Sequence, residues 1–284
     1  MSAPAPALPQ PVGTVGARQV VRMLLVLVLA GFRRFTAYRL AAVAGIVANV
    51  TFGYIRGAVL LAIVGGGSVA AAGYTGQSLM TYNWLTQSAI GALAIWGTTE
   101  VSDRVRTGDI AVDLARPLDL MTTFLAQDLG RALASIVLRG LPTVAVGALT
   151  VGIVLPGHLA PWIAGLLGIA LALVISFLAR FVMQLSSFWV IEIRGIQTFY
   201  MVVSGFFAGL VFPLALMPDW LRAMAMLTPF PSMLQHPIDI LSGRVTGPDI
   251  WWLVAQQVGW LVALVLLGRV LLAAGTRRLV VQGG

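Results

Sequence analysis

The feature that most constrains this fold is a series of six apolar runs, each long enough to cross a membrane as a helix. They occupy approximately 40–64, 77–98, 124–155, 160–185, 195–217 and 250–273. Crossing about 30 Å of hydrocarbon takes about 20 helical residues, whose backbone polar groups are satisfied internally. The chain is 59% hydrophobic and only 10% charged, with a mean hydropathy of +0.94. The sequence therefore predicts an all-α membrane protein with six transmembrane helices.

The third run is too long for one regular span, and it contains Asp128, Arg131, Arg139 and Pro142. We interpret it as a helix that starts in the cytosol and kinks near Pro142, because proline lacks the backbone donor and crowds the preceding turn. Asp128 is expected to pair with Arg131, three residues on, near the cytosolic face.

The N-terminal region precedes these spans and divides into two parts. Residues 1–17 are rich in Ala, Pro and Gly and lack charge, which predicts a disordered tail. Residues 18–37 predict an amphipathic helix at the inner membrane surface, too short in apolar length to span. The alternative is a cleaved signal peptide, which Arg33 and Arg34 disfavour because they would then lead the mature chain. The six-span domain then covers 38–284.

Arginine placement predicts the orientation, since every positive residue of the chain is Arg. With a cytosolic N-terminus, the outward segments 65–76, 156–159 and 218–249 contain only Arg222 and Arg244. Cytoplasmic loops are enriched in positive residues, so both termini are expected inside. The inward segments contain Arg18, Arg22, Arg33, Arg34, Arg39, Arg104, Arg106, Arg116, Arg194, Arg277 and Arg278.

A charged segment at 99–120, EVSDRVRTGDIAVDLARPLDL from Glu100, therefore lies in the cytosol. It predicts a short helix, a turn at Gly108, a second short helix from Asp109, and a stop before Pro117. Asp119 is placed to cap the helix of the third span. A solvated loop needs charge only for solubility, but the density of both signs favours a surface that docks a partner.

The outward segment 213–249 contains six prolines and apolar stretches too short to span. Such segments enter the membrane and return only where protein covers their backbone ends. We therefore expect one or two short re-entrant or interfacial helices on the outer side. The two histidines, His158 and His236, are expected to be ordinary loop residues.

Several kinds of chemistry are excluded by residue type. The phosphate-binding P-loop requires a lysine, and the chain has none, so it cannot hold ATP in such a loop. It has no cysteine and no HExxH motif, and we expect no metal or cofactor. Its arginines lie between apolar runs rather than on a soluble basic face, which argues against nucleic-acid binding.

Arginines within the spans each need an explanation, because an unpaired guanidinium costs at least about 2.5–3.5 kcal/mol at the bilayer centre. Arg131 and Arg180 are expected to extend to the inner surface. Arg56 either extends outward or faces a polar pathway between subunits.

Several segments together resemble the permease subunits of ABC-2 type transporters, in the bacterial branch whose ATPase is a separate chain. They are GDIAVDLARPLDL, Gln127-Asp128-Leu129-Gly130-Arg131, Ser204-Gly205 to Phe212-Pro213-Leu214, Met217-Pro218-Asp219-Trp220-Leu221, Thr228-Pro229-Phe230-Pro231 and Gln235-His236-Pro237. The resemblance implies an N-terminal connecting helix, a coupling helix after the second span, and re-entrant helices between the fifth and sixth spans.

The resemblance also implies an ATP-driven exporter in a bacterial plasma membrane, with two permeases, identical or related, and two ATPases that bind ATP and Mg²⁺. Its substrates would be drug-like molecules, lipids or glycans. The implied ATPase-docking residues are Glu100, Asp103, Arg104, Arg106, Asp109, Asp113, Arg116, Glu192 and Arg194. Small and aromatic residues of the first, second and fifth spans are candidates for the substrate pathway, with ordinary packing or lipid contact as the alternative: Asn49, Phe52, Arg56, Tyr82, Trp84, Phe199, Tyr200, Phe206 and Phe207.

Three other classes of protein are compatible with some of these features. A membrane scaffold would use the same docking loop without moving a solute. A membrane-embedded enzyme would need convergent polar side chains, and a proton-driven carrier would need carboxylates in the middle of its spans. The acidic residues lie between spans or near their ends, so the permease remains the preferred function.

Overall fold

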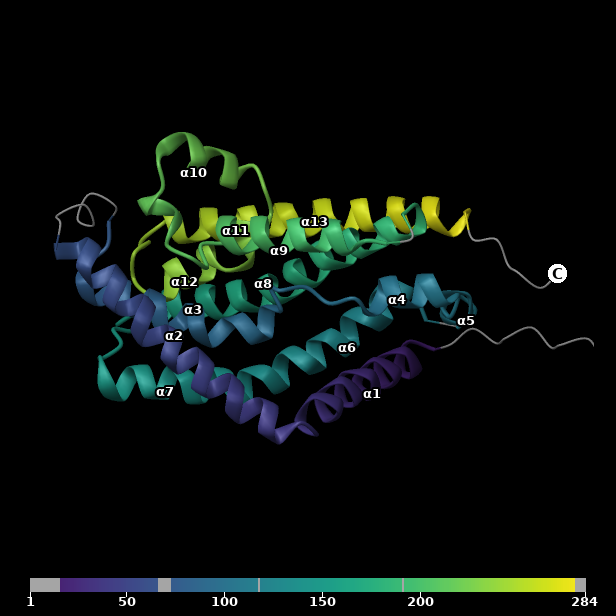
Figure 1. Ribbon diagram of the computed structural model, residues 1–284, viewed down its shortest axis with the longest axis horizontal. Coiled ribbons are helices and arrows are strands. Elements are labelled where there is room, and N and C mark those ends of the chain that lie inside the picture. Colours follow the sequence, from purple (N-terminus) through teal and green to yellow (C-terminus); the bar gives the residue numbers. More distant parts are fainter. Residues whose placement is uncertain (1–15, 66–72, 117, 191, 279–284) are drawn as a thin grey trace, which may run out of the picture.

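The computed structural model describes residues 16–65, 73–116, 118–190 and 192–278, and this part of the chain contains helices and turns but no strand. The helices gather into one elongated body, with α4, α5 and the end of α13 at one end and α7, α10 and α12 toward the other (Figure 1). The elements are α1 Ala17–Thr36, α2 Arg39–Gly65, α3 Gly76–Leu93, α4 Glu100–Thr107, α5 Ile110–Leu114, α6 Leu120–Ser135, η2 Ile136–Gly140, α7 Leu141–Thr150, α8 Leu159–Leu185, η3 Ser186–Phe188, α9 Arg194–Phe207, η4 Leu214–Leu216, α10 Asp219–Met226, α11 Phe230–Met233, α12 Gln235–Leu241 and α13 Asp249–Thr276.

Within the described residues, four helical segments are long and apolar enough to cross a membrane: Arg39–Ile63, Leu120–Thr150, Leu159–Phe188 and Asp249–Thr276. The chain is therefore a multi-pass membrane protein. The other two expected spans correspond to α3 and α9, which are shorter helices of 18 and 14 residues. Helix α3 is also more polar, and its polar side chains are buried by neighbouring helices: Thr81, Asn83, Thr86 and Gln87.

The third span is irregular where the proline predicted it. The α-helix gives way to a π-helical turn at Ile136–Gly140, and α7 then begins with Pro142 in its first turn. A proline removes one backbone hydrogen bond and crowds the preceding turn, and a wider π turn accommodates both effects. Within this turn Arg139 donates to the Ala41 carbonyl at 2.8 Å and lies 5.1 Å from the centre of the Phe35 ring.

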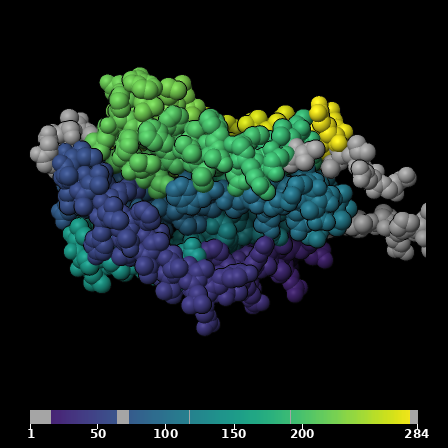
Figure 2. Space-filling model, viewed as in Figure 1, coloured from purple at the N-terminus to yellow at the C-terminus, as the bar shows by residue number. Residues whose placement is uncertain are grey.

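Helix α8 lies at the centre of the molecule and has the largest buried share of the four long segments. It packs along α13 and contacts α3, α6, α9, α11 and α12. Phe177, Leu178 and Phe181 join the principal apolar core. Helix α2 instead lies on the outside, as the violet-to-blue ridge across one face in Figure 2, and its exposed apolar side chains are those expected to meet lipid or another subunit.

The N-terminal helix predicted at 18–37 is confirmed as α1, and the tail predicted at 1–17 lies outside the described residues except for its last two. No α1 side chain is buried, yet the helix packs closely along α6. The closest approach is at Gly31 and Gly130, where each glycine faces the backbone of the other helix. Helix α1 is thus part of the helical body, and its place at the membrane surface stays a prediction.

The outer segment predicted at 213–249 does form short helices, α10, α11 and α12. All seven residues of α12 are buried, as are three of the four in α11, and both helices pack against α8. Protein thus covers their backbone ends, which is the condition for a segment that enters the membrane without crossing it. Their re-entrant placement remains a prediction.

Candidate functional site

The charged segment folds into a helical hairpin, which we define as residues 100–114. Helix α4 ends at Gly108, whose φ of +83° lies in the left-handed region that glycine adopts without strain. Asp109 precedes α5, and the side chain of Asp119 accepts a hydrogen bond from the Thr122 amide at 3.0 Å to cap α6. These predicted signals are confirmed, while Pro117, the predicted stop, lies outside the described residues. Val101 and Ile110 are buried and fix the hairpin to the principal core.

Of the seven charged residues in this segment that were predicted to dock a partner, four are exposed, two are half-buried and one is buried. The buried one is Asp113, which is only 7% exposed and pairs with Arg104 at 2.5 Å and with Arg116 at 3.6 Å. It therefore joins the two short helices and is not available to a partner. The exposed members are Asp103, Arg106, Asp109 and Arg116, with Glu100 and Arg104 half-buried.

A second charged loop adjoins the hairpin. Glu192 and Arg194 lie there at the start of α9, with 3.5 Å between their charged groups. A hollow of about 230 Å³ lies between this loop and α4, and Asp103 and Arg106 line its other side. The fold thus brings together two sets of charged residues that are far apart in the sequence, on one surface.

Gln184, near the end of α8, joins the hairpin to the core. Its side-chain oxygen accepts hydrogen bonds from the backbone amides of Val101 at 2.9 Å and Ser102 at 3.4 Å. These are among the first amides of α4, which have no partner within the helix. Its nitrogen donates to the Thr98 hydroxyl at 3.3 Å. Gln184 therefore fixes the start of α4 to the end of α8.

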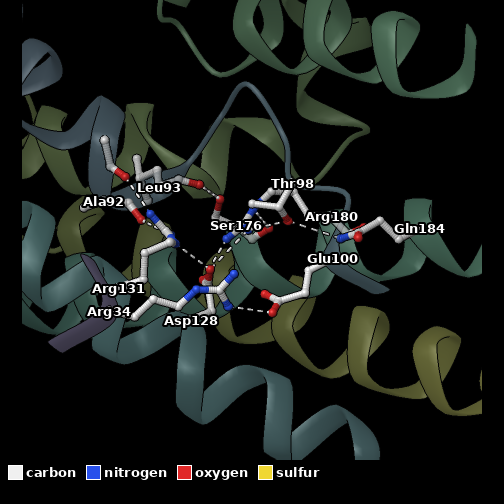
Figure 3. Close-up of polar contacts among 11 residues, drawn as sticks. Arg34, Ala92, Leu93, Thr98, Glu100, Asp128, Arg131, Ser176, Arg180 and Gln184 are labelled. Atoms are coloured by element: carbon white, nitrogen blue, oxygen red, sulfur yellow. Dashed lines mark hydrogen bonds and ion pairs between the residues drawn. The ribbon is translucent and has the colours of Figure 1, made fainter. Parts of the chain in front are cut away.

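One turn before Gln184 lies a buried charge cluster, which we define as Asp128, Arg131 and Arg180 (Figure 3). The Asp128 carboxylate accepts from Arg180 at 2.8 Å and from Arg131 at 2.8 Å. The pair with Arg131 was predicted, but the expectation that Arg180 extends to the inner surface is wrong. Arg180 is 1% exposed, because Asp128 supplies a partner inside the protein.

The cluster also holds the end of α3. Arg131 donates to the carbonyls of Gly91 and Ala92, both at 2.8 Å, and Ser176 of α8 donates to the Leu93 carbonyl. The last carbonyls of a helix lack intrahelical partners, and a cation there is favourable. Helices α3, α6 and α8 therefore meet at a single charged junction beneath the hairpin.

These contacts give the exposed hairpin a polar connection to helices α8, α3 and α6. The family model described as ABC-2 family transporter protein matches residues 59–283. The chain belongs to this ABC-2 family. Among curated proteins, none matches it. The ABC-2 family implies a membrane component that associates with an ABC ATPase.

Some residues that hold the hairpin and the helices around it were missed by sequence reasoning. Arg269 of α13 forms an ion pair with Asp119, the cap of α6, at 2.5 Å. Arg34 of α1 pairs with Glu100 of α4 at 2.9 Å. In the sequence, Gln184 and Arg269 are recognisable only as polar residues inside apolar runs, and this pattern does not indicate which residues they contact.

The residues predicted to line a substrate pathway separate into two groups. Tyr82, Trp84 and Tyr200 are at most 7% exposed and pack inside the protomer, which favours the alternative of ordinary helix packing. Phe52 of α2 and Phe199 of α9 are 61% and 70% exposed, so they remain candidates for contact with a substrate, lipid or second subunit. Asn49, Phe206 and Phe207 are half-buried.

Arg56 points toward the protein. Its guanidinium donates to the Gly209 carbonyl at 3.3 Å, and the Tyr82 hydroxyl oxygen lies 2.9 Å from the same carbonyl oxygen. The other two guanidinium nitrogens, Nε and Nη1, have no partner among the described residues. Of the two alternatives for Arg56, outward extension is disfavoured, and a place beside a polar pathway stays a prediction.

A buried polar network continues from this point through the outer segment. Gln235 accepts from Tyr82 at 2.6 Å and donates to Asp239 at 2.7 Å. Asp239, 1% exposed, also accepts from Tyr74 at 2.6 Å and from Arg244 at 2.7 Å. The network joins α3 to α12 and fixes the outer segment to the spans.

His236 lies in a buried helix of this outer segment, so its assignment as an ordinary loop residue is wrong. It belongs to α12, is 2% exposed, and its Nδ1 lies 3.3 Å from the Ser232 hydroxyl. Burial lowers the pKa of His236 to about 4, although Asp239 acts in the opposite direction and Arg244 adds to the decrease. The imidazole is therefore neutral at pH 7.

The neutral His236 predicts a loss of stability in mild acid. In the unfolded chain the His236 imidazole takes up a proton near pH 6.5, whereas in the folded state it does so only near pH 4. The free energy of unfolding therefore falls by about 1.4 kcal/mol between pH 8 and 5.5. We expect His236→Gln to reduce this slope in thermal unfolding of the purified chain. His158→Gln, at an exposed position, should leave it unchanged. Equal slopes in the wild type and His236→Gln would contradict this assignment.

Proposed function

We propose that the chain is the permease subunit of an ATP-driven exporter and that the hairpin docks a separate ATPase chain. In this proposal α3 and α9 complete six spans, and both termini lie in the cytosol of a bacterial cell. ATP and Mg²⁺ would be bound by the partner, since a chain without lysine cannot form a P-loop.

The observation that carries the proposal is the continuous contact from the hairpin to the spans. The exposed charges Asp103 and Arg106 lie on α4, and α4 is held by Gln184 of α8. The charge cluster, one turn further along α8, then joins α8 to α3 and α6. Packed helices with discrete arrangements can pass a displacement at one end to the other, so ATPase closure against the hairpin would move three spans.

A second permease would pack against the exposed faces of α2 and α9, where Phe52 and Phe199 lie. A pathway between two such faces would be lined by aromatic side chains from both chains. This arrangement suits drug-like molecules, lipids or glycans with apolar parts, because aromatic side chains supply large contact areas.

Charge reversal on α4 tests the docking surface. We expect Asp103→Arg to weaken co-purification with the ATPase at least about tenfold, because like charges opposed across an interface cost several kcal/mol. Substrate-dependent ATP hydrolysis by the complex should fall with it. Pull-down of the tagged chain and phosphate release by the purified complex measure the two effects.

Asp219→Arg is the matched control, since Asp219 and Arg222 form an exposed i,i+3 pair on α10 as Asp103 and Arg106 do on α4. Each substitution sets two arginines side by side on a short helix, so the cost within the chain is similar. The proposal predicts that Asp219→Arg leaves association intact. Equal retention of the ATPase by both variants would show that the hairpin is not the docking surface.

A further inference from the structure

A cavity of about 420 Å³ lies beside the charge cluster, between α1, α6, α8 and the start of α4. Its apolar wall is formed mainly by four aromatic side chains, and Arg34 and Glu100 form an ion pair at its edge. The cavity is large enough for a polar headgroup together with the first atoms of its chains. The aromatic residues are Phe35, Tyr38, Phe124 and Phe177.

The charges around this cavity do not balance. Asp128 is the one carboxylate that pairs with both Arg131 and Arg180, and both guanidinium groups are largely shielded from water. The cluster therefore has a net charge of +1 in a region of low dielectric, where a charge interacts strongly with a neighbouring one. An anion in the cavity would offset the excess.

Arg34 can supply direct contacts to such an anion. Its side chain is 75% exposed, and among the described residues its one hydrogen bond goes to Glu100. Its remaining N–H groups are free to donate, and a guanidinium matches the oxygens of a phosphate group. Arg131 and Arg180 already donate to protein acceptors. They would therefore attract an anion through the net positive charge of the cluster and not through direct hydrogen bonds.

The position of the cavity favours a lipid over a soluble anion. One wall is α1, which is amphipathic and arginine-rich, as helices on anionic membrane surfaces are. Tyr38, at the joint between α1 and α2, lines the cavity and is also 70% exposed, as aromatic residues at membrane interfaces often are. Basic pockets between helices on the cytoplasmic side bind anionic lipid headgroups.

We propose that this cavity binds the phosphate group of an anionic phospholipid from the inner leaflet. The inference rests on the proposed cytosolic placement of the hairpin. A bound lipid would contact α1, α6 and α8 at once, beside the Arg34–Glu100 pair that joins α1 to α4. Lipid occupancy would therefore stabilise α1 against the body.

Lipid titration of the purified full-length chain tests the proposal. In nonionic detergent we expect dioleoylphosphatidylglycerol to raise the unfolding midpoint saturably, while dioleoylphosphatidylcholine does not. Arg34→Gln should weaken the apparent affinity about fivefold, the effect of one cation near an anionic surface. Arg33→Gln, which removes the same charge from a neighbouring position that does not line the cavity, should change it less than twofold.

Two further measurements test whether Arg34 itself binds the lipid and whether the acyl chains are required. Glu100→Gln breaks the pair with Arg34 but keeps the cation, so it should preserve or raise the affinity for phosphatidylglycerol. Glycerol 1-phosphate at millimolar concentration should have no effect without acyl chains. Equal losses in Arg33→Gln and Arg34→Gln, equal effects of the two lipids, or a full response to glycerol 1-phosphate would each overturn the proposal. ATPase association is a separate measurement, so a failed docking test leaves this result interpretable.

Discussion

Replacing Asp128 with Asn should destabilise the protein by about 3–5 kcal/mol, the cost of leaving buried charges without their partner. The change keeps the size of the side chain but removes the carboxylate that holds Arg131 and Arg180. Two guanidinium groups would then face each other across an amide. The unfolding midpoint should fall by roughly 10 °C, measured by intrinsic fluorescence of the purified chain.

Because Arg131 and Arg180 share the one carboxylate of Asp128, we also expect removal of one arginine to cost less than removal of the carboxylate. Arg180→Met leaves a balanced pair of Asp128 and Arg131, so it should cost less than Asp128→Asn although it removes a larger buried group. Asp219→Asn, in the exposed pair with Arg222, should cost less than about 1 kcal/mol. If Arg180→Met destabilises the chain more than Asp128→Asn does, the cluster is not held by charge balance.

The hairpin and the irregular third span are predictable from sequence because their signals are local. Gly108 ends α4, Asp119 caps α6, and Pro142 follows the π turn, all within a few residues of the feature that they determine. The same holds for the pair of Asp128 and Arg131, which are three residues apart on one helix.

The partners of Arg180 and Gln184 are not predictable in this way. Arg180 meets Asp128 across 52 residues of sequence, and Gln184 meets Val101 across 83. A lone arginine near the end of an apolar run favours extension to the membrane surface, unless a buried carboxylate is available. Whether one is available depends on how α6 packs against α8. His236 was misassigned for a related reason, since α12 is buried by its packing against α8, α11, α13 and α3.

The second large effect is expected at Gly130, where α1 and α6 touch backbone to backbone. A Cβ atom there would lie 1.9 Å from the Val28 carbonyl oxygen and 2.8 Å from the Phe32 nitrogen. Gly31 has the reciprocal constraint, at 2.1 Å from the Gln127 carbonyl oxygen. Because backbone atoms cannot change rotamer, Gly130→Ala can be relieved only by moving α1 away. We expect a loss of about 1–3 kcal/mol or more.

Gly259→Ala is the matched control, since Gly259 lies within α13 and a Cβ there meets nothing within 4 Å. That change should be neutral or stabilising by up to about 1 kcal/mol. The chain has no cysteine, so spin labels at exposed Val26 and Leu133 can report the distance between the two helices. Gly130→Ala should lengthen or broaden it, whereas an unchanged distance together with unchanged stability would contradict the close approach.

The effect of Gly130→Ala should extend beyond α1 because five consecutive residues of α6 serve several contacts at once. Gln127 and Gly130 face α1, while Asp128 and Arg131 hold α8 and α3. Moving α1 away would also separate Arg34 from Glu100 and open the cavity between them. We therefore expect Gly130→Ala to abolish the saturable response to phosphatidylglycerol, while Asp103→Arg, on the exposed face of α4, should leave that response intact.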